Sequence, residues 1–113
     1  MNISSQLNCS VLNNKNEISI VLKNGEKIKT DLGILYFFNI EKEIFKKVAI
    51  FVKKSTGKAH YRNYIKRIIR YYIRSNFTLF NKYNRVIFFY NNKNKIKYKF
   101  LEEHLNRVLQ EVY

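Results

Sequence analysis

Three short stretches of the chain are almost continuously apolar, and each predicts a strand. They extend from Leu32 to Phe38, from Lys47 to Val52 and from Arg85 to Tyr90. Runs of this length that are rich in β-branched and aromatic residues are typical of buried strands. The pattern therefore predicts a sheet with an apolar interior.

Two other stretches have the period of an amphipathic helix. Between Ala59 and Ser75, apolar residues recur every three or four positions and form a single stripe. A second helix is predicted from about Tyr98 to Val112, with Leu101, Leu105 and Leu109 among its inward residues. Both helices can bury their apolar stripe against the predicted sheet.

The region before the first predicted strand is compatible with two structures. Ile18 to Leu22 and Lys27 to Leu35 resemble two strands of a β-hairpin that is joined by an Asn-Gly turn. The same region also fits a short helix, with Gly25 as the first residue after its end. Local rules alone favour the hairpin slightly.

The composition indicates one folded domain. A chain of 113 residues with 46% apolar and 16% aromatic residues can bury a modest core. Its one cysteine, Cys9, can form no disulfide within the chain. No apolar run approaches the length of a membrane span, and the first residues lack the features of a secretory signal. We therefore expect a cytoplasmic protein that does not bind membranes.

The charges are distributed very unevenly. The 58 positions from Ile44 to Leu101 hold sixteen lysines and arginines and no acidic residue, in a chain of net charge +14. Such a segment repels itself unless a polyanion neutralises it, and nucleic acid is the expected polyanion. Like charges at i, i+4 also destabilise an isolated helix, so a purely structural helix would not need them. Along the first predicted helix this series is Arg62, Lys66, Arg70 and Arg74, with Arg67 beside it.

The residues from Lys53 to Arg70 carry a more specific signal. A Lys-Lys pair follows the predicted strand, a short loop leads to Ala59, and Arg-Asn-x-x-Lys-Arg-x-x-Arg extends from Arg62 to Arg70. This order and spacing resemble the signature of the bacterial ribonuclease P protein subunit without any gap. The resemblance extends over most of the chain, because the apolar spacing from Leu12 to Gly25 and the strands flanking the signature also match.

The resemblance implies an α+β fold with the element order α-β-β-β-α-β-α. This is a two-layer sandwich in which helices pack on a mixed four-stranded sheet. It places a helix near Asn14 to Asn24, against the hairpin that local rules favour, and a left-handed crossover around the basic helix, contrary to the usual hand. Residues 1–11 are expected to form a polar, mobile segment, and residues 12–113 a single RNA-binding domain.

In this family the RNA subunit holds the catalytic metals and removes the 5′ leader from precursor tRNA. The resemblance therefore implies an accessory subunit of an endoribonuclease, with no catalytic residue and no cofactor of its own, while Mg2+ is expected with the RNA. The expected partners are the catalytic RNA and precursor tRNA, bound by a monomer within the ribonucleoprotein. The residues expected to bind RNA are Lys53, Lys54, Lys58, Arg62, Asn63, Lys66, Arg67, Arg70 and Arg74.

The family also has a cleft for the leader that is lined by aromatic residues. Ile18, Leu22 and Tyr36 mark the position of that cleft in this chain, and a further strand aromatic of the family aligns with Gly33. Each missing ring removes base stacking worth about 1–3 kcal/mol in typical single-strand binders. The resemblance therefore supports the RNA-binding residues more strongly than it supports this cleft.

Other functions fit the sequence less well than this one. A structural ribosomal protein would share the basic helix, but the complete signature after the Lys-Lys pair favours ribonuclease P. A membrane-surface helix would carry Trp, Phe or Leu where isoleucine predominates here. His60 and His104 have no cysteine or carboxylate at ligand spacing, so a zinc site is not favoured. The alternating lysines from Lys93 to Lys99 are interpreted as a solvated edge, with a secondary role at RNA phosphates left open.

Overall fold

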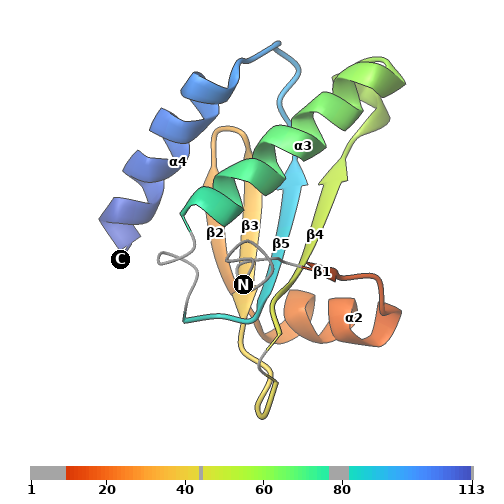
Figure 1. Cartoon of the computed structure of the whole chain (residues 1–113), viewed down its shortest axis with the longest axis vertical. Helices are drawn as coiled ribbons and strands as arrows, with labels where there is room; N and C mark the ends of the chain where they lie inside the picture. Colours follow the sequence, from red (N-terminus) through yellow and green to blue (C-terminus); the bar gives the residue numbers. More distant parts are fainter. Residues whose placement is uncertain (1–9, 44, 77–81, 113) are drawn as a thin grey trace, which may run out of the picture.

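The computed structural model describes residues 10–43, 45–76 and 82–112. These residues form one mixed sheet with helices on both of its faces (Figure 1). In chain order the elements are β1 (Ser10–Val11), α2 (Lys15–Asn24), β2 (Glu26–Thr30), β3 (Gly33–Phe38), β4 (Lys47–Val52), the 3-10 turn η1 (Lys54–Thr56), α3 (Ala59–Ser75), β5 (Arg85–Tyr90) and α4 (Tyr98–Val112).

The five strands lie in the order β1-β4-β5-β3-β2. β4 and β5 are parallel neighbours at the centre, and β1 extends the sheet in parallel beside β4. β3 is antiparallel to β5, and β2 is antiparallel to β3. In Figure 1, α3 lies in front of the sheet, and β5 lies to the left of β4 while both strands point upward. The β4-α3-β5 connection is therefore left-handed, as the resemblance implied.

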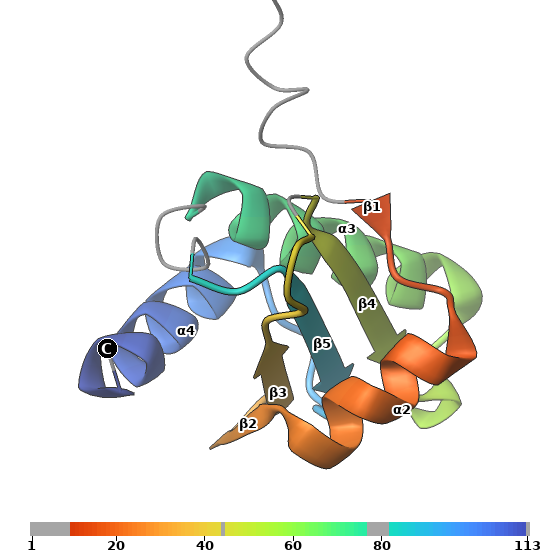
Figure 2. The ribbon, with the colours of Figure 1, turned by 90° about the horizontal axis from the view of Figure 1, so that it is seen from below.

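Two separate cores cover the two faces of the sheet. On one face, Ile65 and Ile69 of α3 and Leu105 of α4 pack against Leu35 and Phe88 of the strands. On the other face, a smaller cluster joins Leu12 and Val21 to Ala49 and Ile87. Figure 2 shows the sheet between α2 on one side and α3 and α4 on the other. The structure thus has three layers, whereas two were expected.

The predicted strands and helices agree closely with the structure, and the strand count differs by one. The additional strand is β1, which the polar sequence around it did not predict. The Ser10 amide donates to the Lys46 carbonyl at 3.0 Å, and the Leu12 amide donates to the Val48 carbonyl at 2.9 Å. Leu12 is buried directly after β1 and holds this edge strand in place. Of the mobile segment predicted for residues 1–11, residues 10 and 11 form β1, and the remainder lies outside the described residues.

The hairpin that local rules favoured around Asn24 and Gly25 is wrong, because α2 occupies this region. The Asn14 side chain caps the helix by accepting hydrogen bonds from the amides of Asn16 and Glu17. Gly25 does follow the last helical residue, but its φ of −73° is not left-handed. Glycine is required there for space, since a Cβ would lie 2.5 Å from the Val21 carbonyl oxygen. The chain turns between strands only later, between β2 and β3.

One fully buried cation connects α2, the β3–β4 loop and the start of β5. The Arg85 side chain is 0% exposed, and its Nε donates to Glu17 Oε1 at 2.7 Å. One Nη donates to Glu43 Oε1 at 3.0 Å, and the other donates to the carbonyls of Phe45 and Asn84. Every branch of the guanidinium therefore has an acceptor, which is the condition for burying a charge.

We expect Arg85→Met to lower the free energy of unfolding by about 3 kcal/mol, because it removes the close partner of Glu17 and leaves only Lys47, at 3.9 Å. Glu43→Ala should lower it by less, about 1–2 kcal/mol, because one Nη of Arg85 loses its acceptor while Glu17 and two backbone carbonyls still accept from the guanidinium. The Glu43 side chain is 41% exposed. Urea unfolding followed by circular dichroism measures both values. Equal losses in the two variants would contradict this account of Arg85.

A candidate nucleic-acid interface on α3

The outer side of α3 carries a line of basic side chains that we call the basic ridge. The helix buries its apolar stripe, including Ile65, Ile69 and Tyr72, against the sheet. This burial fixes the rotation of the helix, so the basic positions must face away from the sheet. The half-buried or exposed side chains of the ridge are Arg62, Lys66, Arg67, Arg70 and Arg74.

The ridge is not neutralised by the protein itself. Within the described part of the chain, the ion pairs join Lys47 and Arg85 to Glu17 and Glu43, and none involves a ridge residue. α4 lies on another flank of α3, where Tyr98 contacts Tyr71 edge to face. The cationic side chains of the ridge therefore repel one another, and they are accessible from outside the protein. An external polyanion would relieve that repulsion.

The loop before α3 adds further positive charge to the ridge. Lys53, Lys54 and Lys58 are all exposed between the end of β4 and the start of the helix. Arg62 is joined to this loop, because its Nε donates to the Gly57 carbonyl oxygen at 3.2 Å. The three lysines and the ridge thus form one basic surface.

Asn63 is exposed within the ridge and does not cap the helix. The N-cap residue is Lys58, whose side chain makes no capping hydrogen bond. Asn63 lies more than one turn into α3, too far along the helix for its side chain to cap the start. A polar contact to a ligand on the ridge stays the prediction for its side chain.

The three residues expected at the leader cleft lie on the opposite face of the sheet, around α2. Ile18 and Tyr36 are half-buried, and each packs against the cluster that contains Val21. Leu22 lies on the same helix but is 37% exposed. The structure therefore brings Ile18 and Tyr36 to one cluster, while Leu22 lies at the margin.

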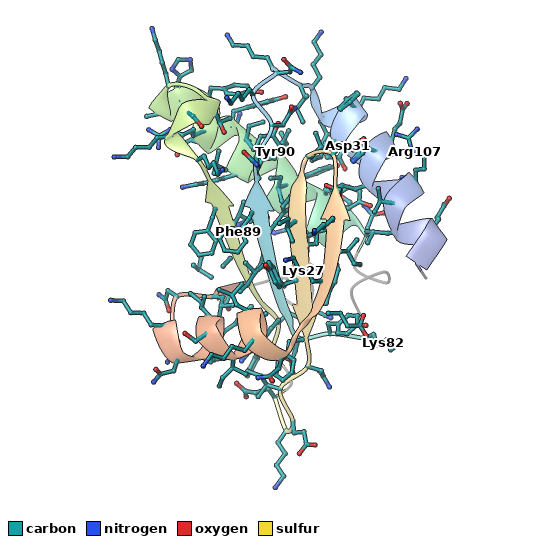
Figure 3. The ribbon with its side chains drawn as sticks, turned by 180° about the vertical axis from the view of Figure 1, so that it is seen from behind. Lys27, Asp31, Lys82, Phe89, Tyr90 and Arg107 are labelled. Atoms are coloured by element: carbon teal, nitrogen blue, oxygen red, sulfur yellow. The ribbon has the colours of Figure 1, made fainter. Side chains whose placement is uncertain are left out.

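Aromatic residues that the sequence analysis did not identify as site residues extend this face. The Phe89 ring stacks on Phe51 at a centroid distance of 4.9 Å and contacts Tyr36 edge to face at 5.8 Å. The Lys27 ammonium lies 5.9 Å from the centre of the Tyr36 ring. Figure 3 shows Phe89 and Lys27 on the same side of the sheet as α2.

A hollow of about 510 Å3, which we call the aromatic hollow, opens beside these rings. Its lining includes Ile34, Phe51 and Phe89, together with Lys29 and Lys53. Phe51 is 39% exposed, so the expectation that its strand is buried throughout is wrong at this position. Strand alternation contained the missing signal, because Phe51 must point away from the face that Ile50 occupies.

Gly33 cannot carry the aromatic side chain that the family often has at the aligned position. Its φ is +154°, and a Cβ would lie 1.9 Å from the carbonyl oxygen of Phe89. The close approach of the two strands therefore requires glycine. Aromatic rings on this face come from β3, β4 and β5 at other positions instead.

Tyr72, Tyr90 and Tyr98 lie in or against the main core, and Tyr72 joins α3 to α4. The Tyr72 hydroxyl donates to Asn106 Oδ1 at 2.7 Å, and burial raises the pKa of Tyr72. Burial likewise raises the pKa of Tyr90 to about 12 and that of Tyr98 to about 12. These hydroxyls stay neutral over the physiological range, so the support behind the ridge does not change with pH there.

Within residues 10–43, 45–76 and 82–112, three or more His, Cys, Asp or Glu side chains never gather as a set of metal ligands. The same ranges contain no helix whose length and apolarity would allow it to cross a membrane.

Comparison with known proteins relates the chain to one family. A family model described as Ribonuclease P matches residues 7–113. The ribonuclease P protein component of Fusobacterium nucleatum is 40% identical over 81 residues, which cover 67% of this chain and 73% of the relative. That of Acholeplasma laidlawii is 30% identical over 99 residues, which cover 87% of this chain and 84% of the relative.

Solved structures agree in fold. The RNase P protein of Staphylococcus aureus, solved at 2.0 Å, superposes with a TM-score of 0.76 at 19% identity and covers 93% of this chain and 96% of its own. The RNase P protein of Thermotoga maritima has a TM-score of 0.74 at 20% identity and covers 92% of this chain and 98% of its own.

We expect Lys66→Gln with Arg70→Gln to leave the free energy of unfolding unchanged or to raise it by about 0.5 kcal/mol, because repulsion between like charges at i, i+4 is removed. Urea unfolding at low and high salt measures the change, and the gain should shrink as salt screens the charges. A loss above about 1 kcal/mol would mean that these side chains stabilise the fold.

Proposed function

Because the chain belongs to the bacterial ribonuclease P protein family, we propose that the basic ridge of α3 binds the catalytic RNA of that enzyme. The chain is a protein component of ribonuclease P, an endoribonuclease of tRNA processing. The family match also excludes the alternative of a structural ribosomal protein.

One observation carries the proposal. The ridge presents several cations at signature spacing on a folded helix, and no carboxylate of the described residues pairs with them. Arginine suits phosphate because its planar guanidinium can donate two parallel hydrogen bonds to phosphate oxygens. Regular spacing on a rigid helix then positions these donors along an RNA backbone, at little cost in conformational entropy.

We propose that the chemistry of cleavage belongs to the RNA and to the Mg2+ it binds. The protein then contributes by neutralising phosphates and holding the RNA in its active arrangement. Lys53, Lys54 and Lys58 extend the same role to the loop before α3, and Asn63 donates to phosphate or sugar oxygens. One copy of the chain would act in each particle, in the cytoplasm.

The aromatic face around α2 supports a second part of the proposal, which is contact with the 5′ leader of precursor tRNA. Tyr36, Phe51 and Phe89 provide ring faces, and Lys27, Lys29 and Lys53 provide positive charge around them. Stacked aromatic rings beside cations are the usual means of binding single strands without sequence preference. Ile18 would add apolar contact from α2, and Leu22 would border the site.

Reconstitution tests the role of the ridge. We expect the chain to stimulate 5′ cleavage of precursor tRNA by a bacterial catalytic RNA at low magnesium, and to cleave nothing by itself. Arg62→Ala with Arg67→Ala should abolish the stimulation while the circular dichroism spectrum stays unchanged. The control variant, Lys15→Ala with Lys42→Ala, removes the same amount of charge at positions outside α3. It should retain most of the stimulation. Loss of folded structure in the ridge variant would instead identify these arginines as structural.

Salt dependence provides an independent check on the same interface. If about six phosphates are neutralised, the logarithm of the association constant should fall with the logarithm of salt concentration at a slope of about −4 to −5. Filter binding of the catalytic RNA across a salt series measures this slope. A slope shallower than about −2 would contradict a multi-phosphate contact.

For the leader site, we expect Phe51→Ala to weaken binding of precursor tRNA to the reconstituted particle by about tenfold, because one stacking surface is lost. Binding of mature tRNA, which has no leader, should not change. Phe45→Ala is a matched control, because that ring is 66% exposed in a separate loop. An equal loss for both RNAs would count against leader recognition by this face.

A further inference from the structure

The loop between β5 and α4 places one lysine against the start of α3. The loop contains Lys93, Lys95 and Lys97, and all three side chains are exposed. From the sequence, these lysines belong to a regular alternation that is interpreted as a solvated edge, with a secondary role at RNA phosphates left open. The structure distinguishes between them, because the contacts of Lys95 reach the helix that carries the basic ridge.

Tyr61, in the first turns of α3, fixes this part of the loop. The Ile96 amide donates to the Tyr61 hydroxyl at 3.0 Å, so the residue next to Lys95 is hydrogen-bonded to the helix. The Lys95 ammonium lies 5.8 Å from the centre of the Tyr61 ring, within the range of a cation–π contact. Within the described residues, the structure gives Lys93 no comparable contact to α3.

A small hollow surrounds this contact. It has a volume of about 380 Å3 and is lined by Gly57, Lys58, His60, Tyr61 and Lys95. Two lysines from distant parts of the chain thus border the same space, and neither forms an ion pair among the described residues. Two lysine side chains at one hollow give it a positive potential, which favours a phosphate group over a neutral or cationic ligand.

A row of aromatic contacts connects the hollow with the basic ridge. The rings of Tyr61 and Tyr64 stack with their centroids 6.0 Å apart, and the Arg67 guanidinium lies 5.6 Å from the centre of the Tyr64 ring. The order along this row is therefore Lys95, Tyr61, Tyr64 and Arg67. The two cations lie at the ends of one continuous surface, so an RNA backbone on the ridge can continue to Lys95.

We propose that Lys95, positioned by Tyr61, binds a phosphate of the catalytic RNA and extends the interface onto the β5–α4 loop. This inference rests on the proposed function of α3. Lys58 borders the same hollow and contacts the same stretch of RNA backbone. Tyr61 acts as a positioning residue, because its hydroxyl holds the loop while its ring lies under the ammonium group.

The test compares Lys95 with Lys93, another lysine of the same loop. Lys95→Ala should weaken binding of the catalytic RNA by about fivefold to tenfold and make the salt slope shallower by about 1. Lys93→Ala removes the same charge from the same loop and should change the affinity by less than about twofold. Filter binding at several salt concentrations measures both quantities.

A second variant separates positioning from general stability. Tyr61→Phe keeps the ring and removes the hydroxyl that accepts the Ile96 amide, so it should weaken RNA binding less than Lys95→Ala does. In the Lys95→Ala background, Tyr61→Phe should have no further effect, because the side chain it positions is already absent. A purely structural tyrosine would lower the affinity by the same factor in both backgrounds.

Equal affinities of the Lys95→Ala and Lys93→Ala variants would overturn the inference, and so would a Tyr61→Phe effect that is unchanged in the Lys95→Ala background. The proposed function would survive either result if the unaltered chain still stimulates cleavage and Arg62→Ala with Arg67→Ala does not. If the unaltered chain does not bind the catalytic RNA, that result contradicts the proposed function itself, and the inference about Lys95 falls with it.

Discussion

The buried guanidinium of Arg85 is the constraint on which the rest of the structure depends. It lies at the start of β5, beside the central strand β4, and its acceptors come from α2, from the β3–β4 loop and from the adjacent backbone. A fully buried charge is tolerated only when each of its donors has a partner. The network therefore specifies where α2 lies on the sheet. That placement in turn determines how much of the aromatic face remains open.

Arginine has two opposite roles in this chain, and burial separates them. Arg85 has carboxylate partners within the protein, whereas the ridge residues on α3 have none among the residues described. Two of the eight acidic residues of the chain, Glu17 and Glu43, form ion pairs with Arg85. The remaining basic charge stays available on the surface. Net charge alone would not reveal this division, because every arginine contributes equally to it.

The two candidate surfaces lie on opposite faces of the sheet and meet where β4 ends. Lys53 lines the aromatic hollow and also begins the basic loop that leads to α3. A sheet with helices on both faces is needed for this arrangement, because one layer of helices would leave α2 and α3 on the same side. The left-handed crossover of α3 belongs to the same arrangement, since the helix returns to β5 beside β4.

The sequence by itself determined the three apolar strands β3, β4 and β5, the two long helices and the basic ridge, because periodicity and charge spacing are properties of neighbouring residues. It also indicated the family through an ungapped signature. Only the tertiary structure decided which residues from distant segments meet. Arg85 and Glu17 are 68 positions apart, and Tyr61 and Ile96 are 35 apart. The choice of helix over hairpin at Gly25, the open face at Phe51 and the position of Lys95 all depend on packing between elements, which no local pattern contains.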